Sequence, residues 1–274
     1  MFWTRLASGI VLVIIALLTM SLGGLPLWGV LLLISLVAYR ELTKALLCAT
    51  DDKKLNALEI LGIAGVFAYY GAIYFSDAEV MLLMCIVGVF MAQMFAYVIA
   101  FPKFQANQVV AAFFSFMYAP VMLSFVYLTR ECPQGIYIVW MILISAWGCD
   151  TCAYVVGKLI GKKKIFPVLS PHKSLEGCIG GVAGAAFIGA LYGYFFVEQM
   201  FPQQRVAWIV AFICGAGAIM SMVGDLAASA IKRNHNIKDY GKLIPGHGGI
   251  MDRFDSMIVT APMIYFLTIL LFRF

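Results

Sequence analysis

The chain has 274 residues, of which 63% are hydrophobic and only 12% are charged. Soluble domains average roughly 45–50% apolar and about 25% charged residues, so this composition excludes an ordinary soluble protein. The sequence is typical of an integral membrane protein, and its formal net charge of +5 has to be interpreted in that setting.

Apolar runs long enough to cross a bilayer, on the order of 17–25 residues each, predict the helices. In chain order these runs cover residues 7–24, 25–46, 59–76, 79–101, 108–128, 136–157, 177–197, 206–228 and 254–272. The first run exceeds the usual ~7–15-residue core of a signal peptide, so we expect it to remain as a span. The expected fold class is all-α, a polytopic integral membrane protein with about nine transmembrane helices.

The basic residues predict the orientation. With a cytoplasmic N-terminus, all of the 19 Lys and Arg except Arg130, Arg205 and Arg273 fall on the cytoplasmic side. The positive-inside rule describes such an imbalance. We therefore expect a site facing the cytoplasm, in a bacterial inner membrane, and a positive charge that reflects topology rather than a nucleic-acid partner.

Charge also divides the chain into two parts of a single membrane domain. The spans of residues 1–130 carry almost no internal charge, so we expect them to form a scaffold. Residues 131–274 are expected to be the catalytic part, because there aspartates enter or border the spans and two basic loops accompany them.

Four aspartates are expected at one depth of the membrane. At about 1.5 Å per residue, Asp150 lies some two-thirds of the way across its span and Asp225 lies near the inner end of another. Asp252 and Asp255 stand three residues apart at the start of the last span, on one helical face. An ionised side chain at a helix centre costs about 2.5–3.5 kcal/mol, so such residues face a partner, a cavity or a site.

Two interpretations of these aspartates remain open. Each could pair with a nearby Lys or Arg for folding, or together they could bind a hard divalent cation. Magnesium fits the second interpretation best, since it uses one or two carboxylates and keeps its other positions for water and substrate phosphate.

Two loops have features of phosphate binding. The stretch from Pro245 to Gly249 cannot be a helix interior, but it can bring backbone N–H groups close to an anion at the start of a helix near Ile250. A tight turn between two spans explains the same glycines. Lys173 and Ser174 combine an ammonium and a hydroxyl, as phosphate recognition requires. The neighbouring lysines 162–164 are interpreted as topology anchors.

The second half of the chain resembles the phosphatidate cytidylyltransferases, also called CDP-diacylglycerol synthases. The residues that carry the resemblance are Ser229, Lys232, Arg233, Lys238, Asp239, Gly241, Pro245, His247, Gly248, Gly249, Asp252, Arg253 and Asp255. The stretch "SPHKSLEG" and the acid in "MVGDLAASAIKR" add to it, so the resemblance covers about residues 150 to 256.

The resemblance implies an enzyme of phospholipid biosynthesis. CTP and phosphatidic acid would react to give CDP-diacylglycerol and pyrophosphate, in a multi-pass membrane homodimer that needs Mg²⁺ and allows a second metal cation. Both substrates are polyanions, one soluble and one anchored among the membrane lipids, so a site at the inner ends of the spans can receive each from its own phase.

Residue roles follow from the resemblance and from the chemistry. Asp225 and Asp252 are expected to hold Mg²⁺, with Asp150 and Asp255 ligating a second cation or orienting the first ligands. The residues expected to bind the phosphate groups of the substrates are Lys173, Ser174, Lys232, Arg233, Lys238, Gly248 and Gly249. His247 would donate to a phosphate oxygen, and Asp239 and Arg253 would orient their neighbours.

Two other classes of protein compete with the enzyme. A transporter of a phosphorylated anion would also place acids and bases at membrane depth, but such proteins usually have broken spans in paired halves, which the sequence lacks. A lipid-binding scaffold would explain the basic loops but not the four aspartates.

Overall fold

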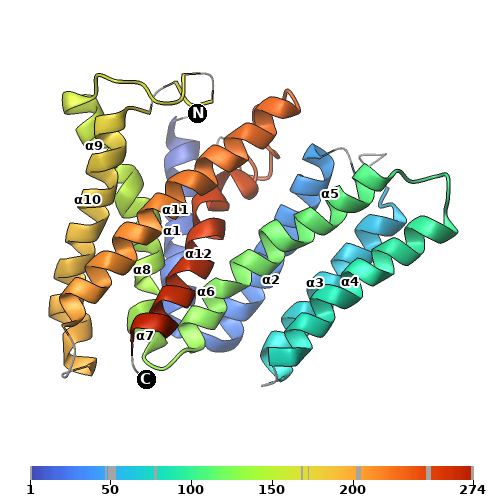
Figure 1. The fold of residues 1–274 in the computed structure, drawn as a ribbon, viewed down its shortest axis with the longest axis horizontal. Coiled ribbons are helices and arrows are strands. Elements are labelled where there is room, and N and C mark those ends of the chain that lie inside the picture. The colour runs from blue at the N-terminus through green and yellow to red at the C-terminus, as the bar shows by residue number, and fades with distance from the viewer. Residues whose placement is uncertain are drawn as a thin grey trace. The chain divides into compact units, whose positions relative to one another are not determined.

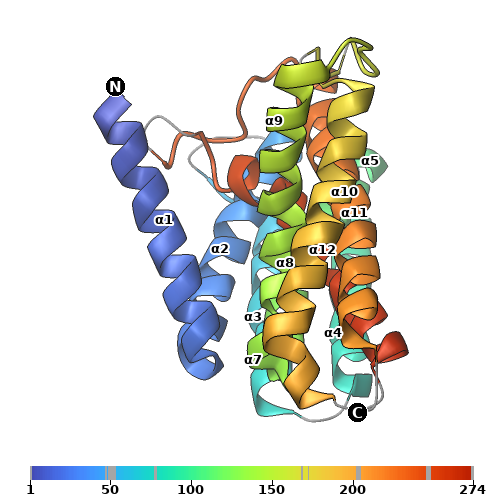
Figure 2. The same cartoon turned by 90° about the vertical axis from the view of Figure 1, so that its left-hand side faces the viewer.

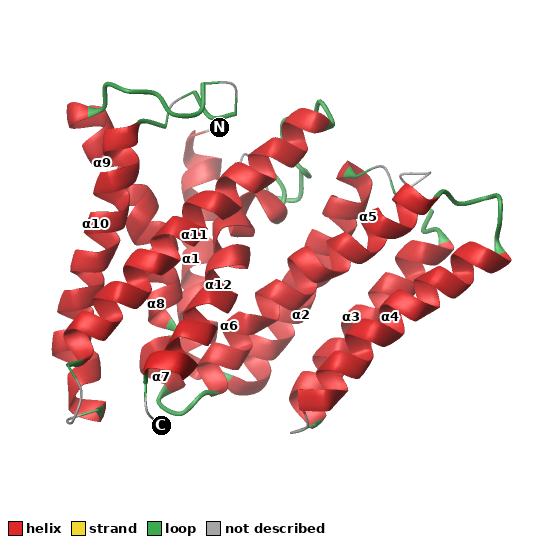
Figure 3. Ribbon diagram, in the orientation of Figure 1, coloured by secondary structure: helices red, strands yellow, loops and turns green. Residues whose placement is uncertain are grey.

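Helices account for the regular structure of the protein. The computed structural model describes residues 2–46, 48, 54–76, 79–167, 169–171, 173–201, 205–244 and 248–272. Within these ranges there are helices, loops and two isolated bridges, and no strand (Figure 3). The predicted all-α fold class is confirmed.

The apolar runs fold as long helices, some of which continue through a π turn. The first part of the chain forms α1 (Phe2–Leu22), α2 (Gly24–Ala45), α3 (Ala57–Phe75), α4 (Glu79–Ile99), α5 (Ala106–Phe116), η1 (Met117–Val121) and α6 (Met122–Glu131). The rest forms α7 (Gly135–Ile138), α8 (Trp140–Leu143), η2 (Ile144–Gly148), α9 (Cys149–Ile160), α10 (Leu175–Tyr192), η3 (Gly193–Val197), η4 (Glu198–Met200), α11 (Val206–Asn234) and α12 (Met251–Leu271).

Among the described residues, eight helical stretches are long and apolar enough to cross a membrane. The ninth expected span is α1, of which Ser8–Leu22 forms a shorter apolar helix. Large apolar side chains such as Phe95, Trp208 and Leu270 are exposed. Contact with lipid explains exposed apolar side chains along these helices, and the chain is a multi-pass integral membrane protein.

The chain forms two compact units. Unit 1 comprises Met1–Ser124 and Asn234–Arg253, and unit 2 comprises Phe125–Arg233 and Phe254–Phe274. The loop between α11 and α12 therefore belongs with the N-terminal helices. The division into a scaffold and a catalytic part, expected at residue 130, concerns function and stays a prediction.

In unit 1, neighbouring helices pack in antiparallel pairs, as α3 and α4 do in Figure 1. The ring of Tyr39 on α2 lies where a Cβ at Gly62 on α3 would be, so the two helices approach closely there. Asn56 and Glu59 form a capping box at the start of α3, in which each side chain accepts the other residue's N–H.

In unit 2, α9 and α10 lie side by side in both Figure 1 and Figure 2. Their contact depends on glycines of α10, because a Cβ at Gly180 or Gly184 would overlap Val156 or Cys152 of α9. Small residues at such contacts let helix backbones approach closely within a membrane. This packing sets the distance between the aspartate of α9 and the loop that leads into α10.

Candidate active site

The residues predicted to form the site fall in both units. Unit 2 carries Asp150, Lys173, Ser174, Asp225, Lys232, Arg233 and Asp255. Unit 1 carries Lys238, Asp239, Gly248, Gly249, Asp252 and Arg253. His247 lies outside the described residues.

Three aspartates of unit 2 come from three different helices. Asp150 lies in the first turn of α9, Asp225 lies in α11 and Asp255 lies in α12. Asp225 interacts electrostatically with the other two, and these two also interact with each other. Because the like charges of these carboxylates repel one another, the cluster favours the binding of positive charge.

Close packing of α11 and α12 brings Asp225 and Asp255 together. A Cβ at Gly224 would lie 2.6 Å from the main-chain oxygen of Asp255, so no larger residue fits there without a shift. The Thr260 hydroxyl donates to the main-chain oxygen of Gly217 at 3.4 Å, further along the same two helices. Glycine at position 224 is thus a structural requirement of the acidic cluster.

Lys173 is the basic residue that lies closest to this acidic cluster. Its ammonium forms an ion pair with Asp225 and also interacts electrostatically with Asp150. The Nζ atom is buried and has no hydrogen-bond partner of good geometry within the described ranges. Lys173 thus already neutralises part of the acidic cluster, and its expected phosphate contact stays a prediction.

The loop before α10 holds Lys173 in place. Lys164 and Ser174 form an antiparallel bridge that closes the loop. The Glu176 carboxylate accepts the N–H of Lys163 at 3.2 Å beside this bridge. Lys173 lies at this closed base of the loop, where its main-chain oxygen accepts the N–H of Ile165 at 3.4 Å.

Ser174 has a structural task. Its hydroxyl accepts the N–H of Gly177 at 3.2 Å and caps the N-terminus of α10, and the residue is only 3% exposed. The hydroxyl hydrogen can still be donated to a ligand. The expected phosphate contact of Ser174 stays a prediction that has to coexist with this cap.

A cavity of about 470 Å³ opens beside Asp150 and Lys173. Lys158 and Lys164 add two more cationic side chains to its lining, and Tyr154 adds an aromatic wall. The Lys158 ammonium lies 5.9 Å from the centre of the Tyr154 ring. The cavity is large enough for a phosphate-bearing group, and three of the four charged side chains in its lining are lysines.

The C-terminal turn of α11 carries two further predicted residues. Lys232 is half-buried and interacts electrostatically with Asp255, whereas Arg233 is exposed. Pairing of acids with bases, one of the two interpretations open from the sequence, is thus present for Lys173 and Lys232. These two cations do not balance the three carboxylates.

The donor set of the cluster has the chemistry that magnesium requires. Carboxylate oxygens are hard ligands, and Mg²⁺ usually takes only one or two of them from the protein. Within the ranges that the structure describes, no group of three or more His, Cys, Asp or Glu is close enough to hold a metal ion. The metal role expected for these aspartates therefore stays a prediction.

Asp252 of unit 1 organises the loop that precedes its own helix. Its Oδ2 atom accepts the N–H of Tyr240 at 2.8 Å and that of Gly249 at 3.0 Å. Gly248 has a φ of +84°, which favours glycine, and its main-chain oxygen accepts the N–H of Ile244 at 3.0 Å. Asp252 thus ties both ends of the loop together.

The start of α12 is occupied by a carboxylate from a distant part of the chain. Glu41 of α2 accepts the N–H of Ile250 at 3.1 Å and that of Met251 at 2.9 Å. The sequence predicted that N–H groups near this helix start would bind a phosphate. In the structure, the N–H groups of Gly249, Ile250 and Met251 are all directed at carboxylates of the chain. The expected phosphate contact of this segment has to coexist with these hydrogen bonds and stays a prediction.

The remaining predicted residues of unit 1 lie at its surface. Lys238, Asp239 and Arg253 are all exposed. They are accessible to a soluble nucleotide, and their expected roles stay predictions.

Comparison with known sequences identifies the family. The profile of the cytidylyltransferase family matches residues 3–271. The chain belongs to this family. Proteins named phosphatidate cytidylyltransferase are similar along nearly the whole chain: 28% identical in Staphylococcus saprophyticus, 29% in Staphylococcus epidermidis and 28% in Staphylococcus aureus. In each case 97% of this chain and 98% of the relative are aligned.

Membership of the cytidylyltransferase family confirms two predictions made from the motif. The family itself is confirmed, and so is the enzyme class, a nucleotidyltransferase of phospholipid biosynthesis. The match also extends the resemblance, which the motif supported only from about residue 150, to the N-terminal helices.

Some residues of the candidate site and of the loop before α12 were missed from the sequence. Glu41 was placed in the uncharged scaffold, although a glutamate inside an apolar span is itself a signal of a buried partner. Lys164 was grouped with two neighbouring lysines as a topology anchor, but it lines the cavity. Lys158 and Tyr154 line it as well and had no distinguishing motif.

Proposed function

We propose that this chain transfers the cytidylyl group of CTP to phosphatidic acid, giving CDP-diacylglycerol and pyrophosphate. The observation that carries the proposal is the family match over residues 3–271, together with relatives named phosphatidate cytidylyltransferase along 97% of the chain. The acidic cluster and basic cavity of unit 2 support it, because they supply the two kinds of charge that such a reaction needs.

In this reaction a phosphate oxygen of phosphatidic acid attacks the α-phosphorus of CTP. A new P–O bond forms there, while the bond to the oxygen that bridges to the β-phosphorus breaks and pyrophosphate leaves. The attacking phosphate is already ionised near neutral pH, so no general base is required. The protein contributes positioning and neutralisation of charge, which dominate catalysis of such transfers.

The proposed magnesium ligands are the aspartates whose negative charge the neighbouring lysines do not fully balance. In unit 2, Asp225 would hold Mg²⁺, and Asp150 and Asp255 would orient it or hold a second cation. On the strength of its motif alone, Asp252 is proposed as a further ligand. When bound, Mg²⁺ would withdraw charge from the phosphate oxygens during transfer.

Basic side chains are proposed to bind the phosphates of both substrates. Lys173 is the best placed, because its buried ammonium has no hydrogen-bond partner of good geometry in the described part of unit 2 and borders the cavity. The others proposed for this task are Ser174, Lys232, Arg233, Lys238, His247, Gly248 and Gly249. Asp239 and Arg253 are proposed to orient their neighbours.

The site is proposed to face the cytoplasm of a bacterial cell, with the chain acting as a homodimer in the inner membrane. The asymmetric distribution of Lys and Arg supports the orientation. The family resemblance supports the dimer.

The proposal is tested with protein purified in detergent and incubated with radiolabelled CTP, phosphatidic acid and Mg²⁺. We expect label in the lipid extract, in amounts equal to the pyrophosphate released. Protein in vesicles that accumulates label without forming new lipid would instead indicate transport of a phosphorylated anion. Protein that does neither would overturn the proposed function.

A further inference from the structure

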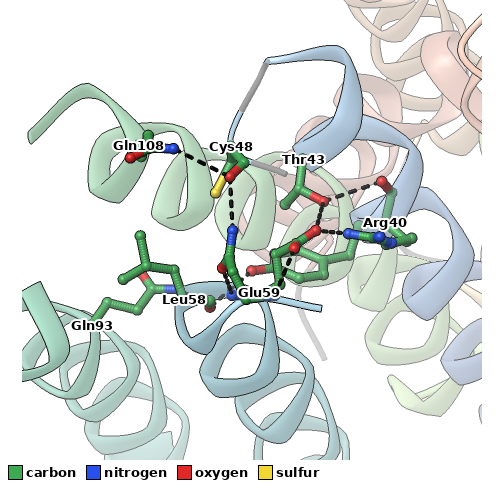
Figure 4. A network of polar contacts seen from close by, with 9 residues as sticks. Arg40, Thr43, Cys48, Leu58, Glu59, Gln93 and Gln108 are labelled. Carbon is green, nitrogen blue, oxygen red and sulfur yellow. Dashed lines mark hydrogen bonds and ion pairs between the residues drawn. The ribbon is translucent and has the colours of Figure 1, made fainter. Parts of the chain in front are cut away.

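The C-terminal end of α2 carries two adjacent charged residues with separate tasks. Arg40 pairs with Glu59 of α3, whose carboxylate also accepts the Thr43 hydroxyl at 3.2 Å (Figure 4). Glu41 reaches the start of α12 instead. The Arg40 contact joins two scaffold helices, whereas the Glu41 contact joins the scaffold to the loop that bears the family motif.

The Glu41 carboxylate has a full set of partners in that loop. Both of its oxygens accept backbone N–H groups, from Ile250 and Met251, at positions 209 and 210 residues away in the sequence. Glu41 and Ile250 are 8% exposed and Met251 is fully buried. A negative charge at a helix N-terminus is favourable, and charge-assisted hydrogen bonds are stronger than neutral ones.

Two glycines of the loop make room for this carboxylate. A Cβ at Gly241 or at Gly249 would overlap the carboxylate of Glu41. Both glycines lie in the motif, one on each side of the segment 242–248. Gly241 and Gly249 therefore both lie against Glu41, and the same Gly249 donates its N–H to Asp252.

We propose that Glu41 is a positioning residue for the loop 240–252. Its carboxylate fixes the first turn of α12 and, through Gly249, the carboxylate of Asp252. The N-terminal helices thus take part in building the catalytic machinery. The link from this contact to turnover rests on the proposed function, but the contact itself does not.

The first test is hydrogen–deuterium exchange of the substrate-free protein in detergent, followed in peptides that cover residues 248–254. Glutamine has one acceptor oxygen where glutamate has two, so Glu41→Gln should speed exchange at Ile250 and Met251 about tenfold or more. Glu41→Asp keeps both acceptors and should lie between Glu41→Gln and the wild type. It also carries the test if the glutamine variant does not fold.

Glu59→Gln is the matched control, because it removes a buried carboxylate of the same unit that caps a different helix. It should speed exchange at the start of α3 and leave residues 248–254 within about twofold of the wild type. Unchanged exchange of residues 248–254 in Glu41→Gln would overturn the positioning role. An equal increase at these residues in Glu41→Gln and Glu59→Gln would overturn it as well.

The second test is turnover, measured per folded molecule. Glu41→Gln should lower kcat about tenfold and raise the Mg²⁺ concentration for half-maximal rate, with a smaller change in the KM for CTP, because Asp252 is displaced. Faster exchange with unchanged kcat and Mg²⁺ dependence would make Glu41 merely structural and contradict the inference. If the wild type makes no CDP-diacylglycerol, the proposed function fails while the exchange result still stands.

Discussion

The carboxylates of the two units differ in how completely they are satisfied. In unit 1, Glu41, Glu59 and Asp252 each accept hydrogen bonds from backbone N–H groups, and Glu59 also pairs with Arg40. In unit 2, the aspartates of α9, α11 and α12 act on one another, and Asp225 pairs with the ammonium of Lys173.

This difference separates Glu41 and Glu59, whose charges hold the fold, from the aspartates of unit 2, which repel one another; Asp252 accepts backbone N–H groups and is also a proposed magnesium ligand. A satisfied buried carboxylate stabilises the local backbone, and its loss leaves donors without a partner. Carboxylates that repel one another destabilise the fold and persist where a cation or substrate relieves the repulsion. The comparison predicts that substituting an aspartate of the unit 2 cluster lowers activity without lowering stability. Substituting Glu59 of unit 1 should lower stability without lowering activity.

The largest effect is expected for Asp255→Asn. The change removes one charge of the acidic cluster but keeps the oxygen that accepts the N–H of Ser256 at 2.8 Å. Formation of CDP-diacylglycerol should fall about a thousandfold, since a metal site supplies several kcal/mol of charge stabilisation. Thermal stability should be unchanged or higher. A clear drop in stability with normal turnover would reverse the assignment.

Lys173→Met should lower kcat/KM about a hundredfold, because it removes a buried cation that faces the cavity. Lys162→Met is the control, since Lys162 is exposed and does not line the cavity. It should keep nearly full activity. Equal losses in the two variants would show that general surface charge, rather than a phosphate contact, matters in this loop.

Glu59→Gln should lower the free energy of unfolding by about 2 kcal/mol, less than for a fully buried pair because part of the Arg40 side chain remains exposed. Turnover per folded molecule should stay close to that of the wild type. Denaturant titration and the lipid-labelling assay together measure both quantities. A catalytic defect without destabilisation would break the contrast between the units.

Ser174→Ala should have the smallest effect. Loss of the cap of α10 costs about 1 kcal/mol of stability, and we expect less than a tenfold change in kcat/KM, because the hydroxyl is largely engaged by Gly177. A loss as large as that of Lys173→Met would show that the Ser174 hydroxyl contributes directly to substrate binding.

Much of the fold could be predicted from apolar runs, because a chain in lipid has to satisfy its backbone hydrogen bonds within each helix. The π turns could not. Met117–Val121 contains Pro120 inside a continuous helical stretch, and hydropathy says nothing about which carbonyl each N–H reaches. The assignment of residues 234–253 to the N-terminal unit was also invisible in the local sequence.

The part of the candidate site that depends only on how deep each aspartate lies in the membrane could be predicted. The helical rise predicts Asp150, Asp225, Asp252 and Asp255 at one level. Three of them, Asp150, Asp225 and Asp255, interact electrostatically in the structure. Glu41 could not be paired with its partners, because its hydrogen bonds join positions more than two hundred residues apart. Nor does composition distinguish Lys164, which lines the cavity, from Lys162 and Lys163, which precede it.

The central claim is that the acidic cluster of unit 2 binds the cation used in cytidylyl transfer. It is tested most directly by titrating Mg²⁺ into substrate-free protein while thermal unfolding is followed, for the wild type, Asp225→Asn and the control Glu176→Gln. Glu176 lies in the same unit but accepts backbone N–H groups of its own loop. The account predicts that Mg²⁺ raises the unfolding temperature of the wild type and of Glu176→Gln but not of Asp225→Asn. An equal rise in all three proteins would contradict it.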